Sequence, residues 1–354
     1  MTEKEWLEIG YDKGIIDCID GETVLFCDVW KNWFCMKKEL IKPQSIDRIE
    51  VCYNRWYLES ALTKMPVNLI SDSDLIKFLQ NCLVTSGEIS AKEISKILQI
   101  MTSVLQHARD LEIKGVGLHD WIRIKQSIPA NKILYSKKKQ EAISNEDIRK
   151  FCDSVIKDRI WEVHQNCCLL LCMNFYMGLR VGELASLTWS DFDFEKKVVR
   201  ITKTESKFYK RNNEGEKTGS MVYRVTDSTK TVYSTREIPM LPEVRYFYDL
   251  IRYEHVSKRY DSEYLAYDGT EGVFVRALDR CVRRVCRLAC IPYFSTHVIR
   301  KTVATKLHFH GTPTRVISDL LGHHDIVTTE SNYILNYKDQ WDIAYEYMHK
   351  GLVY

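Results

Sequence analysis

The stretch from His297 to Tyr333, "HVIRKTVATKLHFHGTPTRVISDLLGHHDIVTTESNY", carries the most informative pattern of this chain. It begins with a His-x-x-Arg pair, His297 and Arg300, whose three-residue spacing places both side chains on one face of a helix. It ends with Tyr333, ten residues beyond His323. One interpretation is a turn followed by an amphipathic helix with a half-buried tyrosine. The other is a tyrosine nucleophile accompanied by groups that stabilise its transition state.

A second motif, "GLRVGELASLTWSDFD", occupies residues 178–193. Arg180 follows a glycine, and Glu183 comes three residues later, on the same side of a helix. Taken alone, this pair predicts a structural ion pair. The complete order is an arginine, a His-x-x-Arg pair, a Gly-His pair and a tyrosine, all within one predicted domain. That combination is far more specific than any of its parts.

Between the two motifs, three segments have the composition of short strands: residues 194–204, 220–227 and 234–240. The charged, glycine-containing residues 205–219 predict a long hairpin loop. The flanking residues are helical in pattern, with Ser144 as an N-cap and Gly178 as a helix terminator. This half of the chain is therefore predicted to be mostly helical, with a small three-stranded antiparallel sheet.

Residues 23–122 show apolar side chains at spacings of three and four, which predicts about four helices. Ser71 and Ser90 are predicted N-caps, and Glu93 completes a capping-box pattern with Ser90. The segment that follows contains a proline and the run Lys137, Lys138 and Lys139, so it is predicted to be an extended linker. The positive charge of this linker is compatible with two interpretations: it lies along a phosphate backbone, or it is simply exposed to solvent.

The predicted fold class is therefore mainly α, with two domains, as a chain of 354 residues allows. The predicted parts are an N-terminal extension (1–22), a helical bundle (23–125), a basic linker (126–143), a mostly helical domain (144–333) and a C-terminal helical tail (334–354).

The composition, with 45% hydrophobic and 28% charged residues, is that of an ordinary globular protein. We expect no secretory signal in the acidic start "MTEKEWLEIG" and no membrane span in the longest apolar run, "CCLLLCMNFYMGL". A cytoplasmic protein is therefore predicted. None of the twelve cysteines forms a C-x-x-C pair, so we expect reduced thiols that pack in the core, and no metal site.

The charge is unevenly distributed. Residues 1–41 hold nine acidic and five basic side chains, a net charge of −4. Because the whole chain has a net charge of +3, residues 42–354 carry a net charge of +7. Residues 276–306 contain eight Lys or Arg and one Asp. Such a cluster suits a phosphate backbone or a solvated face, and charge alone leaves both open.

The two motifs closely resemble those of the tyrosine recombinases, also called the phage integrase family. The resemblance extends roughly from Thr23 to the C-terminus, although the helical bundle is similar to the family's core-binding domain in layout only. It implies the DNA breaking–rejoining fold, with a core-binding domain at 23–125 and a catalytic domain at 144–333. The implied site residues are the two catalytic arginines Arg180 and Arg300, the histidines His297 and His323, the nucleophile Tyr333, the lysine Lys230, and Glu183 in support.

The lysine has two candidates. The family places it in the turn between the second and third strands, where Lys230 lies, whereas Lys203 ends the first strand. The chemistry suits these residue types. Two guanidiniums stabilise the extra negative charge of a phosphorane-like state, without a metal ion. A base, His297, accepts the tyrosine proton, because a phenol has a pKa near ~10. Lys230 supplies a proton to the departing 5′ oxygen.

The resemblance implies a site-specific recombinase that integrates and excises a mobile element through a 3′-phosphotyrosyl intermediate, with no cofactor and no ATP. The implied partners are double-stranded DNA recombination sites, three further copies in a homotetramer, and a directionality factor; association with the nucleoid follows. The tail, 334–354, is expected to pack on a neighbouring protomer or on its own domain. Residues 137–139 are expected to contact DNA.

The long hairpin before Lys230 resembles integrases of conjugative transposons or prophages more than Xer-like resolvases. Many integrases of mobile elements carry a separate small domain for arm-type sites ahead of the bundle, whereas about 22 residues precede it here, so the resemblance leaves arm-site binding open. Two other classes of protein remain as alternatives. A type IB topoisomerase usually has a lysine where His297 stands, and a non-catalytic DNA-binding regulator would be expected to lack one of the catalytic residues.

Overall fold

The structure is a computed structural model that describes residues 24–134, 142–157, 164–212, 216–226, 235–267 and 274–323. The chain divides into two compact units, residues 1–137 with 208–221 and residues 138–207 with 222–354. Several predictions fall outside the described residues: the N-terminal extension, the lysine run 137–139, Lys230, Tyr333 and the tail 334–354.

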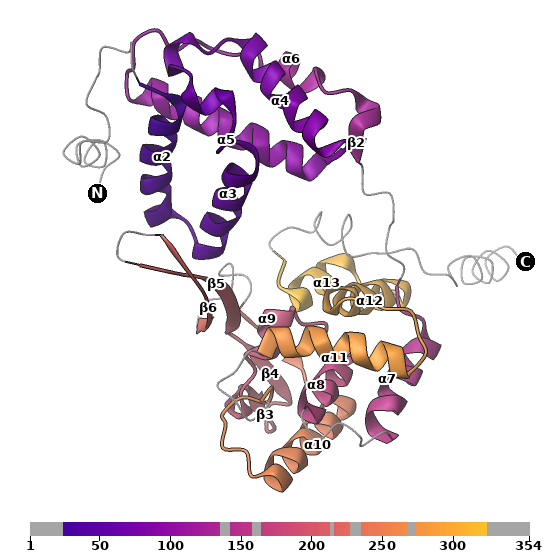
Figure 1. Ribbon diagram of the computed structural model, residues 1–354. Helices are drawn as coiled ribbons and strands as arrows, with labels where there is room; N and C mark the ends of the chain where they lie inside the picture. The colour runs from indigo at the N-terminus through magenta and orange to yellow at the C-terminus, as the bar shows by residue number, and fades with distance from the viewer. Residues whose placement is uncertain are drawn as a thin grey trace, which may run out of the picture. The chain divides into compact units, whose positions relative to one another are not determined.

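The first unit is a bundle of four long helices, as the apolar spacing predicts (Figure 1). Shorter segments connect or follow the four helices, and β1 pairs with β2 in parallel. The elements are α2 (Phe26–Leu40), α3 (Pro43–Trp56), η1 (Ala61–Lys64), η2 (Val67–Leu69), α4 (Asp72–Ser86), β1 (Ile89–Ser90), α5 (Ala91–Asp110), α6 (Trp121–Gln126), η3 (Ala130–Lys132) and β2 (Ile133–Leu134).

Polar caps begin two of these helices. Ser71 and Asp74 form a full capping box at α4, in which the Ser71 side chain accepts from the backbone of Asp74 and the Asp74 carboxylate accepts from Ser71 N at 3.0 Å. At α5, Ser90 Oγ accepts from Glu93 N at 3.2 Å. The carboxylate of Glu93 instead accepts from Trp56 Nε1 at 3.0 Å. The capping box predicted for Ser90 is therefore only half formed, because a tertiary partner takes the glutamate.

Stacked aromatic rings fill the core of this unit. The rings of Trp30 and Tyr53 stack nearly parallel, with their centroids 3.9 Å apart, which joins α2 to α3. Tyr57 is fully buried, and its hydroxyl donates to Ile97 O of α5 at 2.7 Å. Burying a large side chain contributes about 1.5–3 kcal/mol, and the hydrogen bond keeps the buried hydroxyl from opposing it.

The second unit is built around α8, whose residues are buried on every side except at Tyr176. Four other helices pack against it, namely α7, α10, α11 and α12 (Figure 1). A helix that is apolar all round belongs in a core, which explains the long apolar run in the sequence. The helices are α7 (Asn145–Lys157), α8 (Gln165–Met177), α9 (Val181–Ala185), α10 (Pro242–Lys258), α11 (Phe274–Leu288), α12 (Thr296–Phe309) and α13 (Thr314–Leu321).

The predicted end of α8 is confirmed. Gly178 adopts a left-handed conformation, with φ +65°, and caps the helix. A Cβ atom there would lie 3.1 Å from Val303 of α12, so the close packing of the chain also favours glycine. Ser144 caps α7 as predicted, because its Oγ accepts from Asp147 N at 3.0 Å.

A three-stranded antiparallel sheet in the order β3-β4-β7 confirms the predicted fold class. Its strands are β3 (Phe192–Asp193), β4 (Val198–Ile201) and β7 (Arg236–Pro239). The prediction for residues 205–219 as a loop is wrong for most of that segment. β5 (Thr204–Arg211) and β6 (Lys217–Thr226) pair with each other instead, so residues 220–226 lie in this separate hairpin. Charged side chains obscured the strand pattern, because a two-stranded hairpin has little apolar surface to bury.

Candidate active site

Arg180 lies at the start of α9, directly after the glycine turn that ends α8. Its Nη1 donates to Glu183 Oε1 at 2.7 Å, and its backbone N–H donates to Glu183 Oε2 at 3.0 Å. Its Nη2 donates to Gly322 O, at the end of α13, at 3.0 Å. The side chain is 30% exposed. Arg180 is thus held at its base while part of the guanidinium faces solvent.

Arg300 lies on α12, one turn after His297, and is fully buried. Its Nη1 donates to Gly178 O at 3.0 Å, and its Nη2 donates to Leu321 O. The same Nη2 donates to Nε2 of His323 at 2.9 Å. Arg300 therefore joins the end of α8, the end of α13 and the second predicted histidine.

His323 follows the C-cap of α13 and is buried. Burial, followed by the positive charges of Arg300, Arg180 and Arg236, lowers its pKa to about 3. The ring is therefore neutral near pH 7, and its Nε2 lone pair accepts from Arg300. That leaves Nδ1 as the protonated nitrogen, a donor suited to a phosphoryl oxygen.

His297 lies on the exposed face of α12. Partial desolvation lowers its pKa below the ordinary value, and the positive charges of Lys301, Arg300 and Arg180 act in the same direction. The ring is neutral near pH 7 and is able to accept a proton. This state suits the general base that the sequence predicts at this position.

Glu183 is the buried anion of the cluster, with a side chain 2% exposed. Its Oε2 lies 2.9 Å from Arg236 Nη2 and 3.9 Å from Arg300 Nη1. Burial by itself would raise the pKa, but Arg236, then Arg300 and Arg180, lower it to about 2. Glu183 therefore remains ionised and forms an ion pair with Arg180.

Arg236, the first residue of β7, belongs to the same cluster but was missed at the level of the sequence. Its side chain is only 7% exposed, and its Nε donates to Leu320 O at 2.6 Å. The sequence contained a signal. Alternation along β7 places Arg236 on the same face as the buried Ile238, and a charged residue on an inward face needs a buried partner.

Lys203, the alternative candidate for the lysine, is held in a different place. Its Nζ donates to Thr188 Oγ1 at 2.7 Å and lies 3.1 Å from Asp191 Oδ2. These contacts tie Lys203 to the turn before β3. Lys230 and Tyr333 lie outside the described residues, as do Lys137, Lys138 and Lys139.

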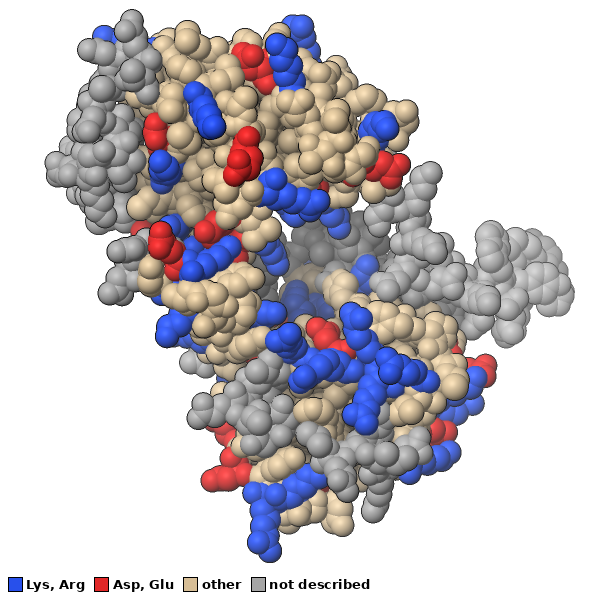
Figure 2. All heavy atoms as spheres, in the orientation of Figure 1, with Lys and Arg blue, Asp and Glu red and all other residues tan. Residues whose placement is uncertain are grey.

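Exposed arginines line one face of α11, while Cys281 and Cys286 of the same helix are buried. Figure 2 shows basic side chains gathered over this helix. The arginines are Arg276, Arg280, Arg283, Arg284 and Arg287. The basic stretch of the sequence thus forms one positive face of the second unit, a face with the charge to attract a polyanion.

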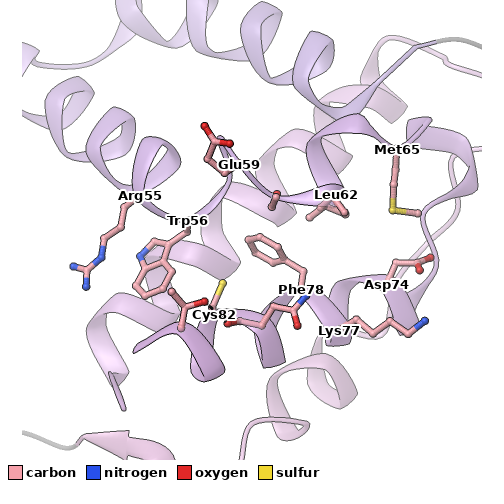
Figure 3. Close-up of a pocket in the computed structure, with 13 residues that line it drawn as sticks. Arg55, Trp56, Glu59, Leu62, Met65, Asp74, Lys77, Phe78 and Cys82 are labelled. Atoms are coloured by element: carbon pink, nitrogen blue, oxygen red, sulfur yellow. Dashed lines mark hydrogen bonds between the residues drawn. The ribbon is translucent and has the colours of Figure 1, made fainter. Parts of the chain in front are cut away.

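A pocket of about 440 Å³ lies in the first unit, between α3, η1 and α4 (Figure 3). Trp56 and Phe78 supply its apolar wall, and Arg55, Glu59 and Lys77 supply charges of both signs. None of the predicted site residues lines it. Its mixed lining indicates no particular ligand.

Among the described residues, no group of three or more His, Cys, Asp and Glu side chains is arranged to bind a metal ion. The helices in the described part of the chain are all too short or too polar to cross a membrane. The described cysteines are free thiols, and most of them are buried.

Comparison with known proteins agrees with the predicted fold and motifs. The model of the phage integrase family matches residues 141–340. A tyrosine recombinase XerC-like protein of Caldanaerobacter subterraneus subsp. tengcongensis is 29% identical over 333 residues, which cover 89% of this chain and 80% of the relative. Transposase A from transposon Tn554 of Staphylococcus aureus is 23% identical over 236 residues, 65% of this chain and 58% of the relative.

Solved structures with the same fold include the Tn1549 transposon integrase in complex with transposon right end DNA. It has a TM-score of 0.67 and 17% identity, and the match covers 93% of this chain and 100% of that chain. The XerH site-specific recombinase bound to a palindromic difH substrate has a TM-score of 0.61 and 14% identity, with 95% and 98% covered. At 17% and 14% identity, both similarities show a shared fold and nothing further.

Proposed function

The chain belongs to the phage integrase family of tyrosine recombinases, and we propose that it integrates and excises a mobile element by cutting and rejoining DNA at specific sites. One observation carries the proposal. Arg180, Arg300 and His323 come from three separate segments of the sequence and meet at the end of α13. Two guanidiniums and a neutral imidazole in one place form a set of donors for a phosphoryl group.

We assign the steps of the reaction to residues as follows. The Oη of Tyr333 attacks the scissile phosphorus while His297 accepts its proton. The bond from phosphorus to the 5′ oxygen breaks, and Lys230 donates a proton to that oxygen. The product is a 3′-phosphotyrosyl bond and a free 5′-hydroxyl. Attack by the 5′-hydroxyl of another strand reverses these steps and rejoins the DNA.

The reaction so assigned consumes no ATP, because the phosphotyrosyl bond conserves the free energy of the phosphodiester. It also needs no metal ion, because Arg180 and Arg300 stabilise the negative charge that a metal would otherwise neutralise. His323 Nδ1 adds a third donor. Glu183 takes no part in proton transfer, because its low pKa keeps it ionised at any pH at which DNA is intact.

The names of two relatives support a mobile element as the substrate, since one is a transposase of Tn554 and another is the integrase of Tn1549. The β5–β6 hairpin, inserted between β4 and β7, supports the same assignment. An Xer-like resolvase is the second candidate, because the XerC-like relative matches 89% of this chain.

For the whole assembly, we propose a core-binding domain at 23–125 and a catalytic domain at 144–333 that grip duplex DNA together. The part of the linker that holds Lys137, Lys138 and Lys139 runs along the phosphates. Four copies assemble on two sites, the tail 334–354 packs on a neighbouring copy, and a directionality factor selects excision. The positive face of α11 supplies electrostatic attraction to DNA.

A suicide substrate tests the function. A radiolabelled duplex that spans an end of the encoding element is nicked near the crossover. On cleavage, the short fragment with the free 5′-hydroxyl diffuses away, so the strand cannot be rejoined and the covalent product accumulates. We expect label to remain with the wild-type protein through SDS and to be absent with Tyr333→Phe. A covalent band that persists in Tyr333→Phe contradicts the assignment of the nucleophile.

A further inference from the structure

The end of α13 is held by three arginines from three different elements. Each of three consecutive carbonyl groups accepts a hydrogen bond from a different guanidinium. The pairs are Leu320 O with Arg236 Nε at 2.6 Å, Leu321 O with Arg300 Nη2, and Gly322 O with Arg180 Nη2 at 3.0 Å. The last carbonyls of a helix have no partner within the helix and carry partial negative charge, so cations stabilise them.

Glu183 joins the same three arginines from the other side. Its Oε1 accepts from Arg180 Nη1 at 2.7 Å, and its Oε2 lies 2.9 Å from Arg236 Nη2. Arg300 Nη1 is 3.9 Å from Oε2. Three positive charges around one buried carboxylate form a network in which each arginine fixes the others.

Arg236 differs from Arg180 in exposure and from Arg300 in its contacts. Its Nε donates to Leu320 O, and its Nη1 and Nη2 lie 3.4 Å and 2.9 Å from the two oxygens of Glu183. Its side chain is only 7% exposed, whereas that of Arg180 is 30% exposed. Arg300 is buried too, but its Nη2 donates to His323.

The fit between Arg236 and the turn after α13 is close. A Cβ atom on Gly322 would lie 3.0 Å from Arg236 Nη1, and Gly322 has a φ of +66°. Glycine thus allows the turn to approach the guanidinium and to adopt the conformation from which His323 follows. In the sequence Arg236 comes six residues after Lys230, the proposed acid.

We propose that Arg236 is a positioning residue for DNA cleavage, which holds Glu183 and the end of α13 so that Arg180 and His323 face the scissile phosphate. This inference rests on the proposed function, because it assigns a role within that reaction. Arg236 acts through Glu183 and Leu320 and makes no contact with the reacting atoms.

Loss of Arg236 has two consequences. The carboxylate of Glu183 loses its strongest compensating charge, so Arg180 is drawn toward it and away from the phosphate. The pKa of Glu183 also rises. The remaining groups that face this carboxylate are Arg180 of α9, Arg300 of α12 and His323 after α13. The charged residues Lys203, Asp191 and Arg200 line the same small cavity as Glu183.

The test compares Arg236→Gln and Arg236→Lys in single-turnover cleavage with DNA at saturation. We expect Arg236→Gln to cleave about a hundredfold more slowly, the size of effect that a misplaced catalytic group produces, with DNA affinity unchanged. The cleavage rate of Arg236→Gln should also fall at acidic pH, because Glu183 becomes protonated there. In wild type Glu183 stays ionised over the same pH range and causes no such fall. Arg236→Lys keeps the charge but not the planar fork, and should recover about tenfold of that loss.

Arg245→Gln is the matched control, because Arg245, unlike Arg200, does not line the small cavity of Glu183. Arg245 lies on α10 and pairs with Asp249 where both side chains are 51% exposed, so its loss should change neither rate nor pH profile. The pKa of Glu183 can also be measured directly, in the absence of DNA. The carbon-13 signal of the Glu183 carboxyl, assigned with Glu183→Gln, should titrate at higher pH in Arg236→Gln than in wild type.

Two results overturn the positioning role. One is an Arg236→Gln protein that cleaves at the wild-type rate with the wild-type pH profile. The other is a parallel loss of DNA binding, thermal stability and cleavage in both Arg236 variants, which would indicate a purely structural residue. Failure of the proposed function has a separate signature, a covalent product that persists in Tyr333→Phe whatever the Arg236 variants do.

Discussion

Replacing Glu183 with glutamine removes the buried negative charge of the arginine network while keeping its shape. Burial raises the pKa of this carboxyl, but Arg236, Arg300 and Arg180 outweigh that effect and lower it from 4.5 to about 2. Because each pKa unit represents about 1.36 kcal/mol, the ionised form is favoured in the folded protein by about 3 kcal/mol. The side chain is 2% exposed, so solvent screens little of this effect.

The direction in which pH changes this stabilisation follows from the difference in proton binding between the folded and unfolded states. The pKa in the folded state is lower than in the unfolded state, so the stabilisation is fully present above pH 4.5 and is lost as the pH falls toward about 2. We expect Glu183→Gln to lower the free energy of unfolding by about 3 kcal/mol at neutral pH. A typical total of about 5–15 kcal/mol leaves the variant folded.

Denaturant unfolding of wild type and Glu183→Gln at a series of pH values measures this difference. Glu237→Gln is the matched control, because Glu237 is a surface carboxylate on β7, 54% exposed and 3.5 Å from Arg200. An exposed ion pair contributes about 0–1 kcal/mol, so this variant should differ little from wild type. A Glu183→Gln effect as small as that of Glu237→Gln, or one that does not shrink in acid, would refute the reasoning.

Three further predictions concern cleavage. Arg300→Lys should slow single-turnover cleavage about a hundredfold or more. The reason is that one ammonium group cannot replace the planar guanidinium, which donates to Gly178 O, Leu321 O and His323. The affinity for DNA in a gel-shift assay should be unchanged. The rate should rise with pH through a pKa below 6.5, since a neutral His297 is the base, and His297→Gln should remove that rise. Lys230→Ala should cleave poorly on ordinary DNA but well when sulfur replaces the bridging 5′ oxygen, because a thiolate leaves without a proton, whereas Lys203→Ala should gain nothing from the sulfur substrate.

Local patterns in the sequence were sufficient for the helical framework. The apolar run of α8, the glycine that ends it, and the serine caps at α4 and α7 act over a few residues, so their geometry follows from the sequence around them. The same holds for the helix α12, which carries His297 and Arg300 one turn apart, although His297 is exposed and Arg300 is buried. The strand β5 and residues 217–219 of β6 escaped prediction, because their charged and polar residues leave no apolar alternation to detect, whereas residues 220–226 of β6 lie within a predicted strand.

The sequence by itself therefore determined the residue types of the candidate site, the order in which they occur and the helices that carry them. Only the tertiary structure decided their partners. Glu93 binds Trp56 instead of closing its capping box, Lys203 is engaged by Asp191, and Arg236 joins Glu183. The physical reason is that an ion pair or hydrogen bond between segments dozens of residues apart depends on how whole helices and strands pack, which no local periodicity encodes.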